Sequence, residues 1–144
     1  MSPTRAAARL PCVAVGLLLA WSLSAAVAQE TLCGKPKTTP EALYQELAKD
    51  AKLREMRRSD IYVALEEGND GILWTFTLPA HPAHPAAICR RVMERRGVLE
   101  IPTSIQCNGP EAACAKLRSD FDMLNERMLK DLYDQQRRQQ QPQK

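Results

Sequence analysis

The sequence is poor in the residues that most enzymes place at their active centres. It has two histidines in 144 residues, and both lie in one short segment, at His81 and His84. No serine stands in the nucleophile-elbow pattern of a hydrolase, and no cysteines are spaced as the Cys-x-x-Cys of thioredoxin-like redox proteins. Aromatic residues make up only 5% of the chain, which leaves little material for a pocket that would shift pKa values. We therefore expect a protein that is not an enzyme and uses no cofactor.

The sequence also lacks an apolar run long enough to cross a bilayer comfortably after its first residues. The apolar run at 13–21 follows a basic segment containing Arg5 and Arg9, and it precedes a small-x-small pattern that ends at Ala28. These features are typical of a signal peptide. We expect residues 1–28 to be cleaved, leaving no transmembrane segment in an exported protein, periplasmic or secreted, whose compartment permits disulfides.

No excess of positive charge remains once this leader is removed. The remaining chain has 18 basic and 17 acidic side chains, and residues 29–134 have 15 basic and 17 acidic ones. A domain with this balance has no electrostatic reason to bind a polyanion. We therefore expect no nucleic-acid partner.

Four cysteines follow the leader, and an even number in an exported chain predicts two disulfides. Three pairings are possible. We favour Cys107–Cys114, because a turn between these cysteines can bring the sulfurs together, and Cys33–Cys89 follows by elimination. In the chain-entropy model the short loop stabilises the fold by about 2.5 kcal/mol and the long loop by about 4 kcal/mol.

The apolar periodicity predicts an α+β fold. A first helix is expected to begin after Thr39, which is a suitable N-cap before Pro40, and to fade near 54–58. Apolar residues alternate through 60–78, which predicts a β-hairpin in which Leu65 pairs with Trp74.

The segment 86–96 fits a helix or a strand. We favour the strand, because the expected strand at 98–107 needs a neighbour, and Pro102 indicates that this last strand lies at an edge. The result is a small antiparallel sheet of three or four strands. We expect an N-terminal helix and a long C-terminal helix to cover one of its faces.

Residues 29–134 are long enough for a single domain that ends in this C-terminal helix. The Gln- and Arg-rich residues 135–144 have the composition of a low-complexity tail, and we expect them to be disordered.

His81 and His84 are the candidate metal ligands, because prolines hold the two imidazoles on one stiff loop. A zinc site needs three or four protein ligands, however, and no second cluster of ligands accompanies them. The favoured alternative is a stiff loop in which the histidines pack locally. A loop of this kind also loses little entropy when it docks on a partner.

Two further features are candidate surfaces for partner binding. Met123, Leu129 and Tyr133 form a second, partial apolar stripe on the C-terminal helix, which could bind an envelope protein or a second copy of the chain unless the first helix covers it. The other feature is a local basic cluster, which we interpret as a solvated, salt-bridged face. Its members are Arg90, Arg91, Arg95 and Arg96.

The function that these features favour is a small exported, non-enzymatic interaction or structural module of the cell envelope. The alternative is a metal- or small-ligand-binding module centred on the loop of His81 and His84.

Overall fold

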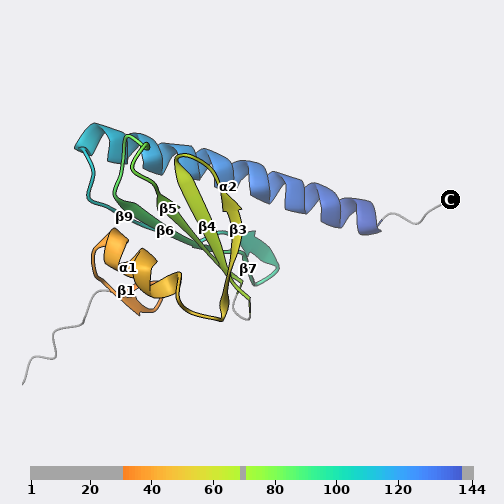
Figure 1. Cartoon of the computed structure of the whole chain (residues 1–144). Helices are drawn as coiled ribbons and strands as arrows, with labels where there is room; N and C mark the ends of the chain where they lie inside the picture. Colours follow the sequence, from red (N-terminus) through yellow and green to blue (C-terminus); the bar gives the residue numbers. More distant parts are fainter. Residues whose placement is uncertain (1–30, 69–70, 141–144) are drawn as a thin grey trace, which may run out of the picture.

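The computed structural model describes residues 31–68 and 71–140, so the predicted signal peptide lies outside the described residues. In this part of the chain two helices flank a run of consecutive strands, and a short two-stranded ribbon precedes the first helix (Figure 1). The elements are β1 (Thr31–Leu32), β2 (Lys35–Pro36), α1 (Pro40–Leu47), β3 (Leu53–Arg58), β4 (Tyr62–Glu67), β5 (Ile72–Thr77), β6 (Ala86–Arg91), β7 (Met93–Arg95), β8 (Val98–Glu100), β9 (Thr103–Cys107) and α2 (Glu111–Gln140).

The central sheet has five strands in the order β3-β4-β5-β6-β9, and every neighbouring pair is antiparallel. Two short ribbons, β1–β2 and β7–β8, lie outside it. The mixed α+β class is confirmed, but the sheet has five strands and not the three or four expected.

The additional strand is β3, in a region where the sequence predicts the fading end of the first helix. Instead α1 ends at Leu47, and residues 53–58 pair along β4. Most residues of β3 are good helix formers and are exposed, so they show no strand alternation. Pairing with β4 outweighs this weak local preference.

The predicted hairpin register is confirmed, because Leu65 pairs with Trp74 and Val63 with Phe76. Of the two interpretations of residues 86–96, the strand is correct for β6, which pairs with β9 through Ile88 and Ile105. The expected strand at 98–107 is divided at Pro102 into β8, which belongs to a separate ribbon, and β9, which lies at the edge of the central sheet as expected.

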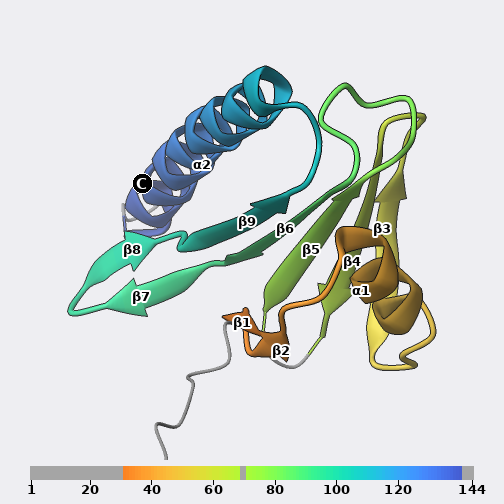
Figure 2. The same ribbon diagram turned by 90° about the vertical axis from the view of Figure 1, so that its left-hand side faces the viewer.

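The two helices cover opposite faces of the sheet, not one face as expected (Figures 1 and 2). On one face, Leu43 and Leu47 of α1 pack on the inward side chains of β4 and β5. On the other face, Leu117 and Phe121 of α2 pack on Ile88 of β6. The reason is that β6 is buried on both of its faces and therefore needs a cover on each.

The helix ends show which local signals hold. The Thr39 hydroxyl accepts a hydrogen bond from the Ala42 N–H at 3.2 Å, which confirms the predicted N-cap. Helix α2 continues to Gln140, so residues 135–140 are helical where the sequence predicts disorder. Pairs such as Lys130–Asp134 and Arg137–Asp134 stabilise this end of the helix. The last four residues lie outside the described part.

Both predicted disulfides are present, Cys33–Cys89 and Cys107–Cys114. They are consistent with an exported protein. Among the residues that the structure describes, no helix combines the length and the apolar character needed to span a membrane.

Candidate functional site

A groove of about 400 Å³ lies between α2 and the sheet, over β3, β4 and β5. It is the candidate site because charged and apolar side chains converge on it. Its lining residues are Arg57, Ser59, Tyr62, Ala64, Thr75, Arg90, Asp120, Phe121, Leu124 and Arg127.

The groove exists because the two faces of the β4–β5 hairpin differ in side-chain size. Trp74 and Phe76 point toward α1 and fill that side of the sheet. Ala64 and Thr75, which stand opposite each other in the register, point toward α2. Because these two side chains are short, the space beneath α2 is left open above them.

Arg90 contributes the most unusual group in the groove. It lies on β6, and only 7% of its surface is exposed. Its guanidinium carbon lies 5.0 Å from the centre of the Phe121 ring, a cation–π contact. One of its terminal nitrogens is 3.5 Å from Asn125 Oδ1 and equally far from Met128 Sδ. The contact with Asn125 Oδ1 is at the long limit for a hydrogen bond, and the thioether sulfur of Met128 is only a weak acceptor.

The Nε of Arg90 is buried and has no hydrogen-bond partner among the described residues. Within residues 31–68 and 71–140, no carboxylate forms an ion pair with Arg90, Arg57 or Arg127. The one acidic group in the lining, Asp120, is bound by Lys116 at 2.6 Å. The groove is therefore cationic, and burial lowers the pKa of Arg90 because it disfavours the charged form.

A second hollow of about 380 Å³ lies beside the first and shares Tyr62 and Asp120 with it. Its remaining lining residues are Ile61, His81, Pro82, Ala113, Lys116 and Leu117. Four of these residues are apolar and none is an arginine, so this end of the site differs from the arginine-lined end.

His81 and Tyr62 are held together where the two hollows meet. The His81 Nε2 is 2.7 Å from the Tyr62 hydroxyl, and His81 Nδ1 accepts a hydrogen bond from the Ala83 N–H at 3.0 Å. Since Nδ1 is an acceptor, neutral His81 carries its proton on Nε2 and donates it to Tyr62. Burial lowers the pKa of His81 and favours this neutral form.

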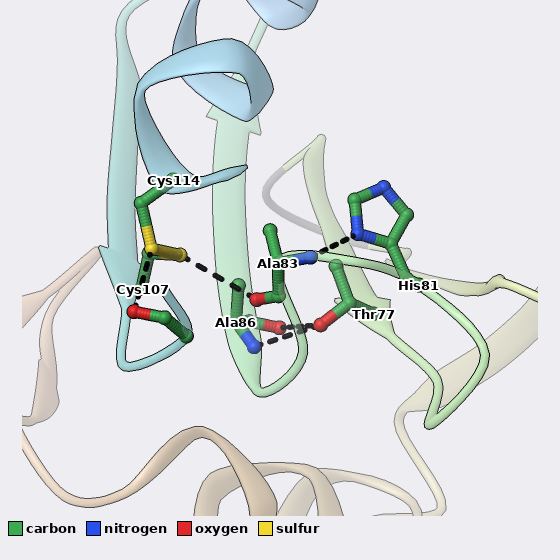
Figure 3. The surroundings of a disulfide bond; sticks show 7 residues. Thr77, His81, Ala83, Ala86, Cys107 and Cys114 are labelled. Carbon is green, nitrogen blue, oxygen red and sulfur yellow. Dashed lines mark hydrogen bonds between the residues drawn. A yellow bond between two sulfur atoms is a disulfide. The ribbon is translucent and has the colours of Figure 1, made fainter. Parts of the chain in front are cut away.

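The loop that carries His81 is positioned by the loop closed by the Cys107–Cys114 disulfide (Figure 3). The Asn108 N–H donates to the Pro85 carbonyl at 2.9 Å. Gly109 packs so closely on the backbone at Ala83 that a Cβ there would lie 2.7 Å from the Ala83 oxygen. The disulfide-closed loop therefore fixes one end of the site.

The two histidines that the sequence places in one candidate metal site are each engaged in hydrogen bonds. Both ring nitrogens of His81 are engaged in the hydrogen bonds described above, and His84 Nδ1 is 2.9 Å from the Thr77 carbonyl oxygen. In the described part of the chain, no group of three His, Cys, Asp or Glu side chains is placed to hold a metal ion. The metal site stays a prediction that still needs its other ligands.

The three predicted partner-binding residues lie on the outer part of α2. Met123 is 49% exposed and Tyr133 37%, and the Tyr133 hydroxyl accepts a hydrogen bond from the Leu99 N–H at 3.0 Å. Leu129 and Tyr133 are one turn apart, whereas Met123 points elsewhere, because each residue rotates the helix by about 100°. The structure therefore brings two of the three together, and their partner role stays a prediction.

Sequence reasoning missed the groove and placed Arg90 in the solvated basic cluster. Its neighbour Arg91 is exposed, as expected for that cluster, but Arg90 is buried under α2. The available signal was the alternation of β6, which places Arg90 on the same face as Ile88. The contributions of Arg57 and Arg127 could not be foreseen, because they come from distant elements.

Comparison with protein-family models, curated proteins and solved structures finds no match for this chain. The functional argument therefore depends on the geometry of the site alone.

Proposed function

We propose that this chain is a small exported, non-enzymatic binding module that holds an anionic ligand with an apolar body in the groove beneath α2. The proposal follows the small-ligand alternative, but its centre lies at Arg90, and the loop of His81 forms one end. Periplasm or extracellular space is the proposed location, which the two disulfides support.

The observation that supports this function most directly is the buried guanidinium of Arg90. Leaving its Nε without a partner costs about 1–3 kcal/mol, whereas the contact with Phe121 returns about 0.5–2 kcal/mol. Stability therefore gives little reason to bury an arginine here. A ligand carboxylate, sulfonate or phosphate would supply the missing acceptor and form charge-assisted hydrogen bonds.

The small, partly apolar floor supports the same conclusion. Ala64, Thr75, Phe121 and Leu124 surround the space beside the guanidinium. Pockets for small molecules commonly have this composition, with a few polar groups that orient a mainly apolar ligand. Interaction with an envelope partner through Leu129 and Tyr133 remains the second proposal. Its support is that Asn125 is the last buried residue of α2, so the helix beyond it is at least partly accessible.

Binding of two dyes with closely related apolar rings tests the function. We expect the mature protein to bind 1-anilinonaphthalene-8-sulfonate at least tenfold more tightly than the neutral N-phenyl-1-naphthylamine, measured by fluorescence titration. Arg90→Met should remove this preference, because it keeps the bulk of the side chain and removes the charge. The matched control is Arg91→Met, which changes the exposed neighbour and should keep the preference.

The same variants show whether Arg90 is a structural residue instead. We expect Arg90→Met to leave the free energy of unfolding unchanged or to raise it by about 1 kcal/mol, because an uncompensated buried charge is replaced by an apolar group. Equal dye binding by wild type and Arg90→Met, or a loss of more than about 2 kcal/mol in stability, would contradict the proposal.

A further inference from the structure

We infer that the ligand is a single-chain amphiphile, with its anionic head group at Arg90 and its hydrocarbon chain running past Tyr62 into the second hollow. This inference rests on the proposed function and adds the class and the orientation of the ligand. It commits to one chemistry, a linear chain with one acidic head, as in a fatty acid or an anionic lysophospholipid.

The two hollows have different linings, and this difference sets the orientation. Three arginines line the groove beneath α2, which is the first hollow, and have no ion pair among the described residues. They are Arg57, Arg90 and Arg127. The second hollow has no arginine in its lining. Its apolar members are Ile61, Pro82, Ala113 and Leu117. A ligand that satisfies both ends is therefore charged at one end and apolar at the other.

The arrangement along α2 requires a long ligand. The helix residues that line the two hollows run from Ala113 to Arg127, which corresponds to about 21 Å along the helix axis at 1.5 Å per residue. The hollows meet at Tyr62 and Asp120, which line both. A compact ligand would fill one hollow only, whereas an extended chain would lie in both.

Tyr62 lies where the ligand would pass from the arginine-lined groove into the apolar hollow. Its ring contacts Phe121 edge-on, with the ring centres 6.4 Å apart, and His81, with the ring centres 4.7 Å apart. Its hydroxyl accepts a hydrogen bond from His81 Nε2, so the polar end of Tyr62 is satisfied and its ring is the apolar surface between the groove and the second hollow. The Lys116–Asp120 pair lies at the rim and is satisfied internally, so it does not compete for the head group.

Competition between the sulfonate dye and a series of carboxylates tests this inference. The series is butyrate, octanoate, dodecanoate and palmitate, each below its critical micelle concentration, added to the mature protein. We expect affinity to rise about fourfold for each methylene that becomes buried, the equivalent of about 0.8 kcal/mol. Ala113→Phe should fill the second hollow and stop this rise after octanoate, while butyrate binds as before. Ala112→Phe, which enlarges an exposed position one residue away, should retain the full rise.

The outcomes separate the inference from the proposed function. Dye binding that needs Arg90, but with equal affinity for all four carboxylates, would overturn the amphiphile and leave the anion site standing. If the wild-type protein neither prefers the sulfonate dye nor binds any of the carboxylates, the proposed function itself would be overturned. Displacement of the dye by an acidic peptide but not by palmitate would overturn the amphiphile in favour of a peptide.

A second experiment identifies the chemical class of the amphiphile. Palmitate is compared with palmitoyl lysophosphatidylglycerol and with zwitterionic palmitoyl lysophosphatidylcholine. Both anionic compounds should bind, and the tighter one tells whether the head group is a free carboxylate or a lipid phosphate. Lysophosphatidylcholine should bind at least tenfold more weakly, and equal binding of all three would contradict a site built around Arg90.

Discussion

His81 links the stability of the fold to pH. Its pKa lies below the ordinary value of 6.5, chiefly because burial disfavours the charged form, while Lys116 and His84 lower it further and Asp120 opposes them. Below pH 6.5 the unfolded chain therefore binds a proton at this position before the folded chain does. The stabilising contribution is complete above pH 6.5 and is lost as the pH falls through the pKa of the folded state.

We therefore expect the wild-type protein to lose stability between pH 7.5 and pH 5.5, and His81→Gln to lose less over the same interval. Glutamine does not titrate, so the difference between the two proteins isolates the histidine. Urea unfolding at the two pH values measures the effect, and other titrating groups cancel in the comparison. An identical loss in both proteins would show that the folded and unfolded states hold the His81 proton equally well.

The environment of a single residue is predictable from the sequence where a local rule decides it. The Thr39 cap and the pairing of Leu65 with Trp74 follow from spacing alone, and both are present. The environment of Arg90 is set by α2, which arrives more than twenty residues later in the chain. Strand alternation places Arg90 on the same face as Ile88, but no local signal shows that a helix covers that face.

Two loops far apart in sequence form one end of the site, and Gly109 is where their backbones meet. A Cβ at this position would lie 2.7 Å from the Ala83 carbonyl oxygen and 2.8 Å from its carbon, so one of the loops would have to move. We expect Gly109→Ala to destabilise the protein by about 1–3 kcal/mol, the usual cost of overpacking. Denaturant unfolding measures this change.

The matched control is Gly68→Ala, because no heavy atom lies within 4 Å of the Cβ it would add. We expect that variant to stay within about 0.5 kcal/mol of wild type. If both variants were equally stable, the close approach of the 83–85 backbone to Gly109 would not constrain the fold.

At the scale of whole elements, the sequence predicts the helices and strands that have an apolar alternation or a helix cap. It misses a strand that forms only because a neighbouring strand pairs with it. The β4–β5 hairpin has a clear apolar face and was identified with its register. Strand β3 has one partly buried residue in six, so its sequence resembles the continuation of a helix. It is a strand because β4 offers an unpaired edge, a long-range condition that local propensity does not contain.

In the molecule as a whole, one face of the central sheet is closely packed against a helix and the other face carries a groove. Helix α1 meets large side chains of β4 and β5 and closes that face, whereas α2 meets Ala64 and Thr75 and leaves the groove. The expectation that both helices share one face concealed this difference, because it left the other face to solvent. The groove depends on the joint placement of β3, β6 and α2, since each contributes one of its arginines.

The two disulfides close loops of different length, and this difference predicts how much each contributes to the stability of the fold. Cys33–Cys89 closes a loop with a sequence separation of 56, and Cys107–Cys114 one with a separation of 7. In the chain-entropy model, replacing the first pair by alanines costs about 4 kcal/mol and replacing the second about 2.5 kcal/mol. Cys89 is also fully buried in the α1-side core, which increases the cost of the first replacement.

We therefore expect Cys33→Ala/Cys89→Ala to be the less stable of the two double variants in denaturant unfolding. Peptide mapping without reductant should show that each variant retains the other disulfide. Cys107→Ala/Cys114→Ala should remain folded but bind long carboxylates more weakly, because its loop positions the backbone next to His81. A greater loss of stability in this second variant would mean that docking of the short loop, and not closure of the long one, contributes most to stability.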